Sequence, residues 1–166
     1  RICACGVLEL GGFANLTSAT DYLSIGFNPS IGYFFMDNFE ISAIIGLSYT
    51  NQTINPVGAG STEVSTTVLS LLAEPSFHVP FSQTLYGFLG VGFGLASQGV
   101  NPGTSSGAGF AIAPRLGLNI IVGRSGIFTP ALQGVYQTTE AISTPQGAVV
   151  ALKSSFGLQA GYTVMW

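Results

Sequence analysis

The chain has 166 residues, of which 47% are apolar and 7% are charged, and its net charge at neutral pH is −3. Soluble domains carry about 25% charged residues, so this chain has too few charges for a surface that faces water on all sides. It also lacks the run of about 18 apolar residues that a transmembrane helix needs, and its glycine content disfavours long helices. The negative net charge provides no basic surface, which argues against nucleic acid as a partner.

Apolar and polar residues alternate with a period of two along most of the chain, which is the pattern of β-strands. Eight such segments are predicted, at residues 6–13, 22–35, 39–53, 63–79, 85–97, 110–122, 127–138 and 147–166. Pro29 falls inside the second segment, where a proline cannot donate a ladder hydrogen bond. A local bulge is therefore expected at Pro29.

The connections between these segments alternate between short and long. Short turns are expected near residues 36–38, 80–84 and 123–126, and longer loops near 14–21, 54–62, 98–109 and 139–146. Residues 1–5 are expected to form an N-terminal tail. Its Cys3 and Cys5 have no histidine cluster beside them, so we interpret them as ordinary cysteines and expect no metal or cofactor. The layout predicts one domain, residues 1–166, of consecutive antiparallel hairpins.

The last segment, residues 147–166, carries the most specific signal. Its apolar row consists of Val150, Leu152, Phe156, Leu158, Ala160, Tyr162, Val164 and Trp166. Gln159, Gly161, Val164 and Trp166 match the spacing of the C-terminal assembly signal of bacterial outer-membrane barrels. There, a polar residue, a glycine and two apolar or aromatic residues end the last strand.

The chain thus resembles a small outer-membrane barrel of the OmpA/OmpX type, although that family usually ends in phenylalanine and Trp166 departs from this. The resemblance covers the layout of nearly the whole chain. It implies an all-β fold, an eight-stranded antiparallel up-and-down transmembrane β-barrel. It also implies a place in the bacterial outer membrane, with both termini periplasmic and with outer-membrane lipid and the barrel-assembly machinery as partners.

The two faces of the strands differ in side-chain size and charge. One face carries large apolar residues, and the other carries glycine, serine, alanine, asparagine and glutamine. Eight strands leave an interior only just wide enough for side chains, so the large apolar face is expected to point outward to lipid. A soluble lipocalin-like carrier is the alternative on strand count, but it would have to hide the apolar face inside.

Five charged residues fall at strand positions on the small-residue face: Glu9, Glu40, Glu74, Arg115 and Lys153. Buried charges must be paired or hydrogen-bonded. We therefore predict a network of these five side chains that plugs the barrel interior. The alternative is a narrow ion path or a gate.

Catalysis is not expected. The only histidine, His78, shares the inner face with Ser76 and Glu74, and a lipid-modifying outer-membrane enzyme built on these residues is the alternative. By resemblance, the expected role is that of a structural or adhesive surface protein, or of a membrane-anchoring subunit of an assembly. Other surface or periplasmic proteins would then be its partners.

Overall fold

The computed structural model describes residues 4–19, 22–54, 62–101, 106–138, 142–144, 147–149 and 154–166. Its strands are β1 (Leu8–Ala19), β2 (Tyr22–Met36), β3 (Phe39–Ile54), β4 (Thr62–Pro80), β5 (Leu85–Asn101), β6 (Ser106–Val122), β7 (Gly126–Gln137), β8 (Ile142–Thr144), β9 (Gly147–Val149) and β10 (Ser154–Met165). In this part of the chain, no helix is long and apolar enough to span a membrane.

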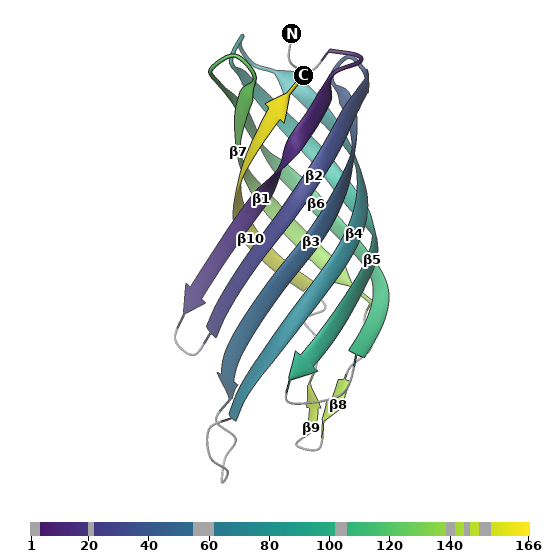
Figure 1. Cartoon of the computed structure of the whole chain (residues 1–166), viewed down its shortest axis with the longest axis vertical. Helices are drawn as coiled ribbons and strands as arrows, with labels where there is room; N and C mark the ends of the chain where they lie inside the picture. The colour runs from purple at the N-terminus through teal and green to yellow at the C-terminus, as the bar shows by residue number, and fades with distance from the viewer. Residues whose placement is uncertain are drawn as a thin grey trace.

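Eight of the strands close into a barrel in the order β1-β10-β7-β6-β5-β4-β3-β2, and neighbouring strands are antiparallel (Figure 1). The two short strands β8 and β9 form a separate hairpin between β7 and β10. β1 begins and β10 ends at the end of the barrel that carries the short turns (Figure 1). The predicted all-β, eight-stranded antiparallel up-and-down barrel is confirmed.

Several strands are longer than the sequence pattern predicts. Residues 14–19 continue β1 and pair with β2, so the loop predicted at 14–21 is wrong over most of its length. Likewise, Gln98 pairs with Gly107 within the predicted loop 98–109, and β5 reaches Asn101. Glycine and serine have weak strand propensity. The register is already set by the other pairs of the same two strands, however, and each further pair adds ladder hydrogen bonds.

The last predicted strand is shorter than the pattern indicates. Gly147–Val149 pairs with Ile142–Thr144 instead of with the barrel, and the barrel strand begins at Ser154. The loop predicted at 139–146 therefore contains a strand of its own. Val150, Leu152 and Lys153 lie outside the described residues.

The bulge predicted at Pro29 is also wrong. The register between β2 and β3 is the same on both sides, with Phe27 opposite Leu47 and Ser30 opposite Ile44. Pro29 itself lies opposite Gly12 on β1. The register shift in this hairpin falls between Phe34 and Met36, next to the tight turn.

The alternation of side chains puts the large apolar row on the outside of the barrel. On β5, Leu89 is 58% exposed and Leu95 is 68% exposed, whereas their neighbours Phe88 and Ala96 are buried. Large apolar residues are exposed on every barrel strand. The buried polar residues, by contrast, point into the barrel, as the sequence predicts.

The barrel closes where the first strand meets the last. Six register pairs join β1 to β10, from Glu9 opposite Met165 to Ala14 opposite Ala160. At the very end, Leu8 and Trp166 exchange two backbone hydrogen bonds of 3.1 Å. The C-terminal residue thus belongs to the ladder that closes the ring.

The turn between β2 and β3 depends on Asn38, which has a φ of 65°. Asparagine tolerates this left-handed conformation, whereas a β-branched residue does not. We expect Asn38→Val to lower the free energy of unfolding by about 1–2 kcal/mol. Asn38→Gly should leave it nearly unchanged. Urea titration of the refolded barrel measures both, and an equal loss in the two variants would contradict the conformational explanation.

Candidate functional site: the polar barrel interior

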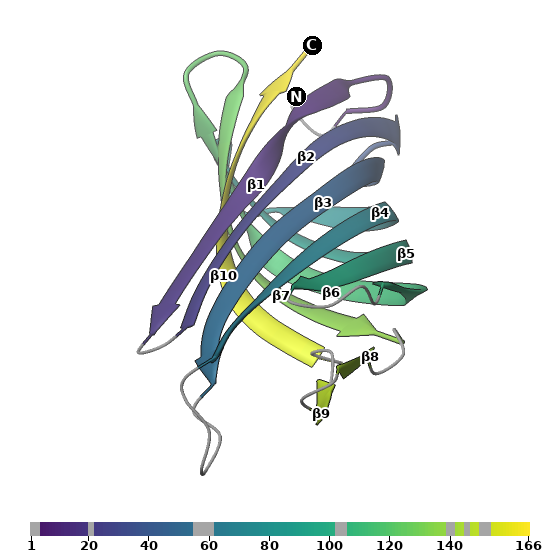
Figure 2. The same cartoon turned by 60° about the horizontal axis from the view of Figure 1, so that its bottom comes forward.

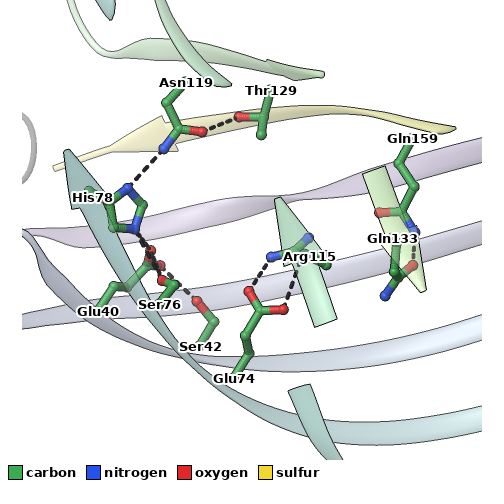
Figure 3. Close-up of polar contacts among 10 residues, drawn as sticks. All are labelled: Glu40, Ser42, Glu74, Ser76, His78, Arg115, Asn119, Thr129, Gln133 and Gln159. Carbon is green, nitrogen blue, oxygen red and sulfur yellow. Dashed lines mark hydrogen bonds and ion pairs between the residues drawn. The ribbon is translucent and has the colours of Figure 1, made fainter. Parts of the chain in front are cut away.

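The centre of the interior is a buried ion pair between β6 and β4. Arg115 Nε donates to Glu74 Oε2 at 2.7 Å, and the second guanidinium nitrogen, Nη2, donates to Glu74 Oε1 (Figure 3). Both side chains are almost fully buried. A guanidinium bound by two parallel hydrogen bonds gives a strong and directional pair, which is the geometry that makes a buried pair tolerable.

Small and aromatic neighbours hold this pair in place. The Arg115 guanidinium lies over the ring of Phe13, 4.0 Å from the ring centre, and 5.4 Å from the centre of Phe88. Gly90 leaves the space that the carboxylate of Glu74 fills, because a Cβ there would lie 2.9 Å from the Glu74 carboxylate carbon. The cation therefore has a carboxylate on one side and an aromatic face on another.

A second cluster lies nearer the short turns, around Glu40. Ser42 Oγ donates to Glu40 Oε1 at 2.7 Å, and His78 Nε2 lies 3.0 Å from Glu40 Oε2 (Figure 3). Ser76 Oγ lies 3.3 Å from the same Oε2. Gly32 provides the space for this carboxylate, because a Cβ there would overlap Glu40 Oε1.

His78 connects this cluster to the opposite wall. Asn119 Nδ2 lies 3.0 Å from His78 Nδ1, and Thr129 Oγ1 donates to Asn119 Oδ1 at 2.9 Å. An amide nitrogen can only donate, so Nδ1 must accept and the ring hydrogen lies on Nε2, facing Glu40. This one tautomer satisfies the whole chain of hydrogen bonds from β3 to β7.

The geometry does not pair His78 with Glu74, the carboxylate that the sequence offered for a catalytic set with Ser76. Glu74 does not approach His78 but binds Arg115, and the carboxylate beside His78 is Glu40. Ser76 lies 3.1 Å from the same Nε2 that faces Glu40. A nucleophilic triad instead needs serine on one ring nitrogen and the carboxylate on the other.

The hydrogen bonds of Glu40, Glu74 and Arg115 form two clusters among the described residues. Glu40 and Arg115 belong to separate clusters, and Lys153 lies outside the described residues. Glu9 lines a small cavity of about 20 Å³ together with Glu40 and Arg115. The Glu9 Oε2 atom is buried and has no hydrogen-bond partner among the described residues.

The residues of the proposed C-terminal signal lie on both faces of β10. Gln159 points inward and donates from Nε2 to Gln133 Oε1, and Gly161 is covered by the ring of Phe13. Val164 lies on the opposite face, and Trp166 is 66% exposed. The polar and glycine positions thus fit the narrow interior, while the two apolar positions belong to the outer wall.

The two halves of the interior differ in how they are filled. The half at the short turns holds the clusters of Glu40 and Glu74 beside a cavity of about 20 Å³. The half at the long loops contains a larger cavity of about 310 Å³, and Arg115 lines both. The Arg115–Glu74 pair therefore separates a packed interior at the short turns from a hollow interior at the long loops. We call the larger cavity the upper cavity, although Figure 1 draws the long-loop end at the bottom.

Solved outer-membrane barrels share this fold. The N-terminal β-barrel domain of Pseudomonas aeruginosa OprF aligns with a TM-score of 0.57 and 18% identity over 98% of each chain. Neisserial surface protein A aligns with a TM-score of 0.58 and 15% identity over 95% of this chain and 94% of that chain. OprG, an outer membrane protein from Pseudomonas aeruginosa, aligns with a TM-score of 0.57 and 13% identity over 100% of this chain and 99% of that chain. The chain has the fold of an OmpA/OmpX-type barrel.

No protein-family model matches the chain, and no curated protein matches it. The likeness to OmpA/OmpX-type barrels is therefore one of fold, established by strand number, topology and coverage.

The sequence pattern did not single out the aromatic residues of this OmpA/OmpX-type interior. Phe13, predicted to end the first strand, is buried against Arg115, and Phe34 packs edge-on against His78 with ring centres 5.0 Å apart. Asn119 and Thr129 complete the histidine chain. The alternation of the sequence predicts that Asn119 and Thr129 point inward, but it does not predict which side chains they contact across the barrel.

The buried pair supplies a test by double-mutant cycle. Arg115→Met leaves Glu74 buried without a cation, which typically costs about 3–5 kcal/mol. Glu74→Gln in the same chain should restore part of the loss, because the unpaired charge is then removed. Denaturant unfolding in detergent measures the free energy of unfolding of the two single variants and of the double variant.

The control for this cycle is Glu63→Gln, which changes an exposed carboxylate at the start of β4 and should have little effect. Strictly additive losses from Arg115→Met and Glu74→Gln would show that the two side chains do not stabilise each other.

Proposed function

We propose that the chain is an integral protein of the bacterial outer membrane, with a side-chain plug in the short-turn half of its barrel. The observation that carries this proposal is the outer wall, where large apolar side chains are exposed on every barrel strand. Soluble monomers rarely expose contiguous apolar patches above a few hundred Å². A belt of this kind around a closed barrel matches the lipid-facing band of outer-membrane proteins.

The aromatic residues support the same placement. Tyr33, Phe77 and Trp166 are exposed near the short turns, and Tyr49, Phe110 and Tyr136 are exposed toward the long loops. Aromatic side chains collect at both membrane–water interfaces. By analogy with barrels of this fold, the short turns and both termini would face the periplasm and the long loops the outside.

Within that placement, we infer a structural or adhesive role at the cell surface, or a role as the membrane-anchoring subunit of an assembly. Barrels of the same fold include Neisserial surface protein A and the outer membrane protein OprG. The barrel-assembly machinery would recognise the last strand through Gln159, Gly161, Val164 and Trp166. Outer-membrane lipid would contact the apolar wall.

The alternatives fit the geometry less well. A soluble lipocalin-like carrier would expose a polar outer wall, which is the reverse of what the barrel presents. A lipid-modifying enzyme would need a reactive serine open to substrate, but Ser76 and His78 are buried next to a cavity of about 20 Å³. We therefore expect His78→Ala to lower the stability of the folded barrel. We expect no lipid-modifying activity from the wild-type protein, and so no such activity for this variant to lose.

A charge on the outer wall tests the membrane placement. Leu71 is 59% exposed on β4 between the two aromatic belts, whereas its neighbour Ser70 points into the upper cavity. Leu71→Arg should cost about 2–4 kcal/mol in folding into lipid vesicles, the value for arginine near the bilayer midplane. Ser70→Arg should cost less. The shift of the folded band on unheated gels measures the folded fraction, and a worse defect in Ser70→Arg would reverse the assignment of the two faces.

The plug predicts the behaviour of the barrel in planar bilayers. Because the short-turn half is filled by the clusters of Glu40 and Glu74, a single reconstituted barrel should pass little or no current. Large, steady, porin-like conductance steps from the pure protein would rule out the plugged interior. Folded protein on unheated gels from the same preparation shows that silent bilayers contain intact barrels.

A further inference from the structure

The upper cavity has the size and lining of a small-molecule site. Its volume of about 310 Å³ falls in the range of ligand pockets, about 300–1,000 Å³. Its polar lining consists of amides and hydroxyls such as Gln133, Gln137 and Asn28. Among the described lining residues only Arg115 is charged, and its charge is already paired with Glu74. Through its described lining residues, the cavity therefore offers hydrogen bonds and no free charge.

One wall of the barrel interior is apolar. Ile44, Leu72, Ala96 and Ala111 form a buried cluster, against which Val68 and Val135 pack. These residues come from β3 to β7, and the strand order places β4 and β5 across the barrel from the junction of β1 and β10. Apolar residues are the exception on the inner face of a barrel whose interior is otherwise polar.

The junction opposite this wall is open in its upper part. Pairing between β1 and β10 stops at Ala14 and Ala160, although β1 continues to Ala19 and β10 begins at Ser154. The remaining residues of β1 pair only with β2, and those of β10 only with β7, within the described residues. Figure 2 shows the two strands diverging from each other away from the chain ends, toward the long-loop end of the barrel.

The upper cavity extends into this opening. Asn15 lines it on β1, and the stretch from Ser155 to Gln159 lines it on β10. Phe156 and Leu158 belong to the outward row and are 76% and 74% exposed, yet they also line the cavity. Gly157 between them has open space where a side chain would be. The hollow interior is therefore continuous with the outer wall.

The opening lies at the depth of the membrane, if the placement proposed above holds. Ser154 pairs with Tyr136 on β7, and Leu16 lies on β1 opposite Ile25, whose other partner is Tyr49. Tyr49 and Tyr136 belong to the aromatic belt toward the loops. The unpaired strand edges thus run from that belt toward the middle of the barrel, through the loop-side half of the apolar band.

Unpaired strand edges at this depth need hydrogen-bonding partners. Hydrocarbon offers none, and backbone without partners is tolerated in a membrane only where it is buried or lines a hydrated cavity. We propose that the upper cavity is a binding site for an uncharged single-chain amphiphile, which enters from the membrane between β1 and β10. Its polar head would reach the free backbone groups and amides, and its chain would lie against the apolar wall. This inference rests on the proposed membrane placement.

The seam itself is tested by paired cysteines, after both native cysteines are replaced by serine. Ala14→Cys/Ala160→Cys joins the last paired positions, and Leu16→Cys/Leu158→Cys joins the next outward-facing positions that would pair if the ladder continued. All four sites face outward. A disulfide requires Cα atoms about 4.4–6.8 Å apart, so the first pair should oxidise rapidly and the second severalfold more slowly. Equal oxidation rates would overturn the open seam.

Ligand entry is tested by NMR on the full chain folded in detergent micelles. The probe is a monoacylglycerol that carries a nitroxide at the end of its acyl chain. The methyl signals of Val68 and Val135 should broaden severalfold more than those of Ile127, which is buried near the short turns. The ionised fatty acid with the same nitroxide should broaden Val68 much less. Equal broadening of Val68 and Ile127, or equal effects of the two probes, would overturn the proposal.

The route is tested by closing the seam with a bifunctional thiol reagent in Leu16→Cys/Leu158→Cys. Broadening of Val68 should then be lost, and the Ala14→Cys/Ala160→Cys barrel treated in the same way should keep it. Undiminished broadening in the closed seam would refute lateral entry. A wild-type chain that does not give a folded band in micelles would instead overturn the membrane placement, and this inference with it.

Discussion

The closure of the backbone ladder is the constraint on which this barrel depends. A strand that faces lipid can satisfy its N–H and C=O groups only through its neighbours, so any edge left unpaired within the membrane must line a cavity that supplies partners. The reciprocal hydrogen bonds between Leu8 and Trp166, and the six pairs above them, connect the two ends of the chain. Strand number then sets the width of the interior, and the width decides which side chains fit inside.

The interior shows how such a narrow space is used. The carboxylates of Glu74 and Glu40 each lie over a glycine, Gly90 and Gly32, because the wall has no room for two side chains at the same place. The charges are then satisfied in different ways, Glu74 by a guanidinium and Glu40 by hydroxyls and a histidine. The Arg115–Glu74 pair joins β6 to β4, which share no ladder, whereas the Glu40 contacts lie within β3 or join it to its neighbour β4.

The fold was largely predictable from the sequence, and the contacts inside it were not. A period of two marks strands and faces, so the inward position of Glu40, Glu74 and Arg115 followed directly. Loop lengths were overestimated because composition was used to end strands that the ladder extends, as at residues 14–19. Partner choice depends on strand tilt and stagger. The pattern therefore could not show that His78 meets Glu40, 38 residues away, or that Phe13 covers Arg115.

The position of Trp166 makes the chain its own optical reporter. It is the one tryptophan in the sequence, it lies on the outer wall, and its backbone pairs with the first strand. Indole emission shifts to shorter wavelength when the ring leaves water for an apolar surrounding. The intrinsic fluorescence of the unlabelled protein therefore follows the docking of the last strand onto the first, at the junction where the ring closes.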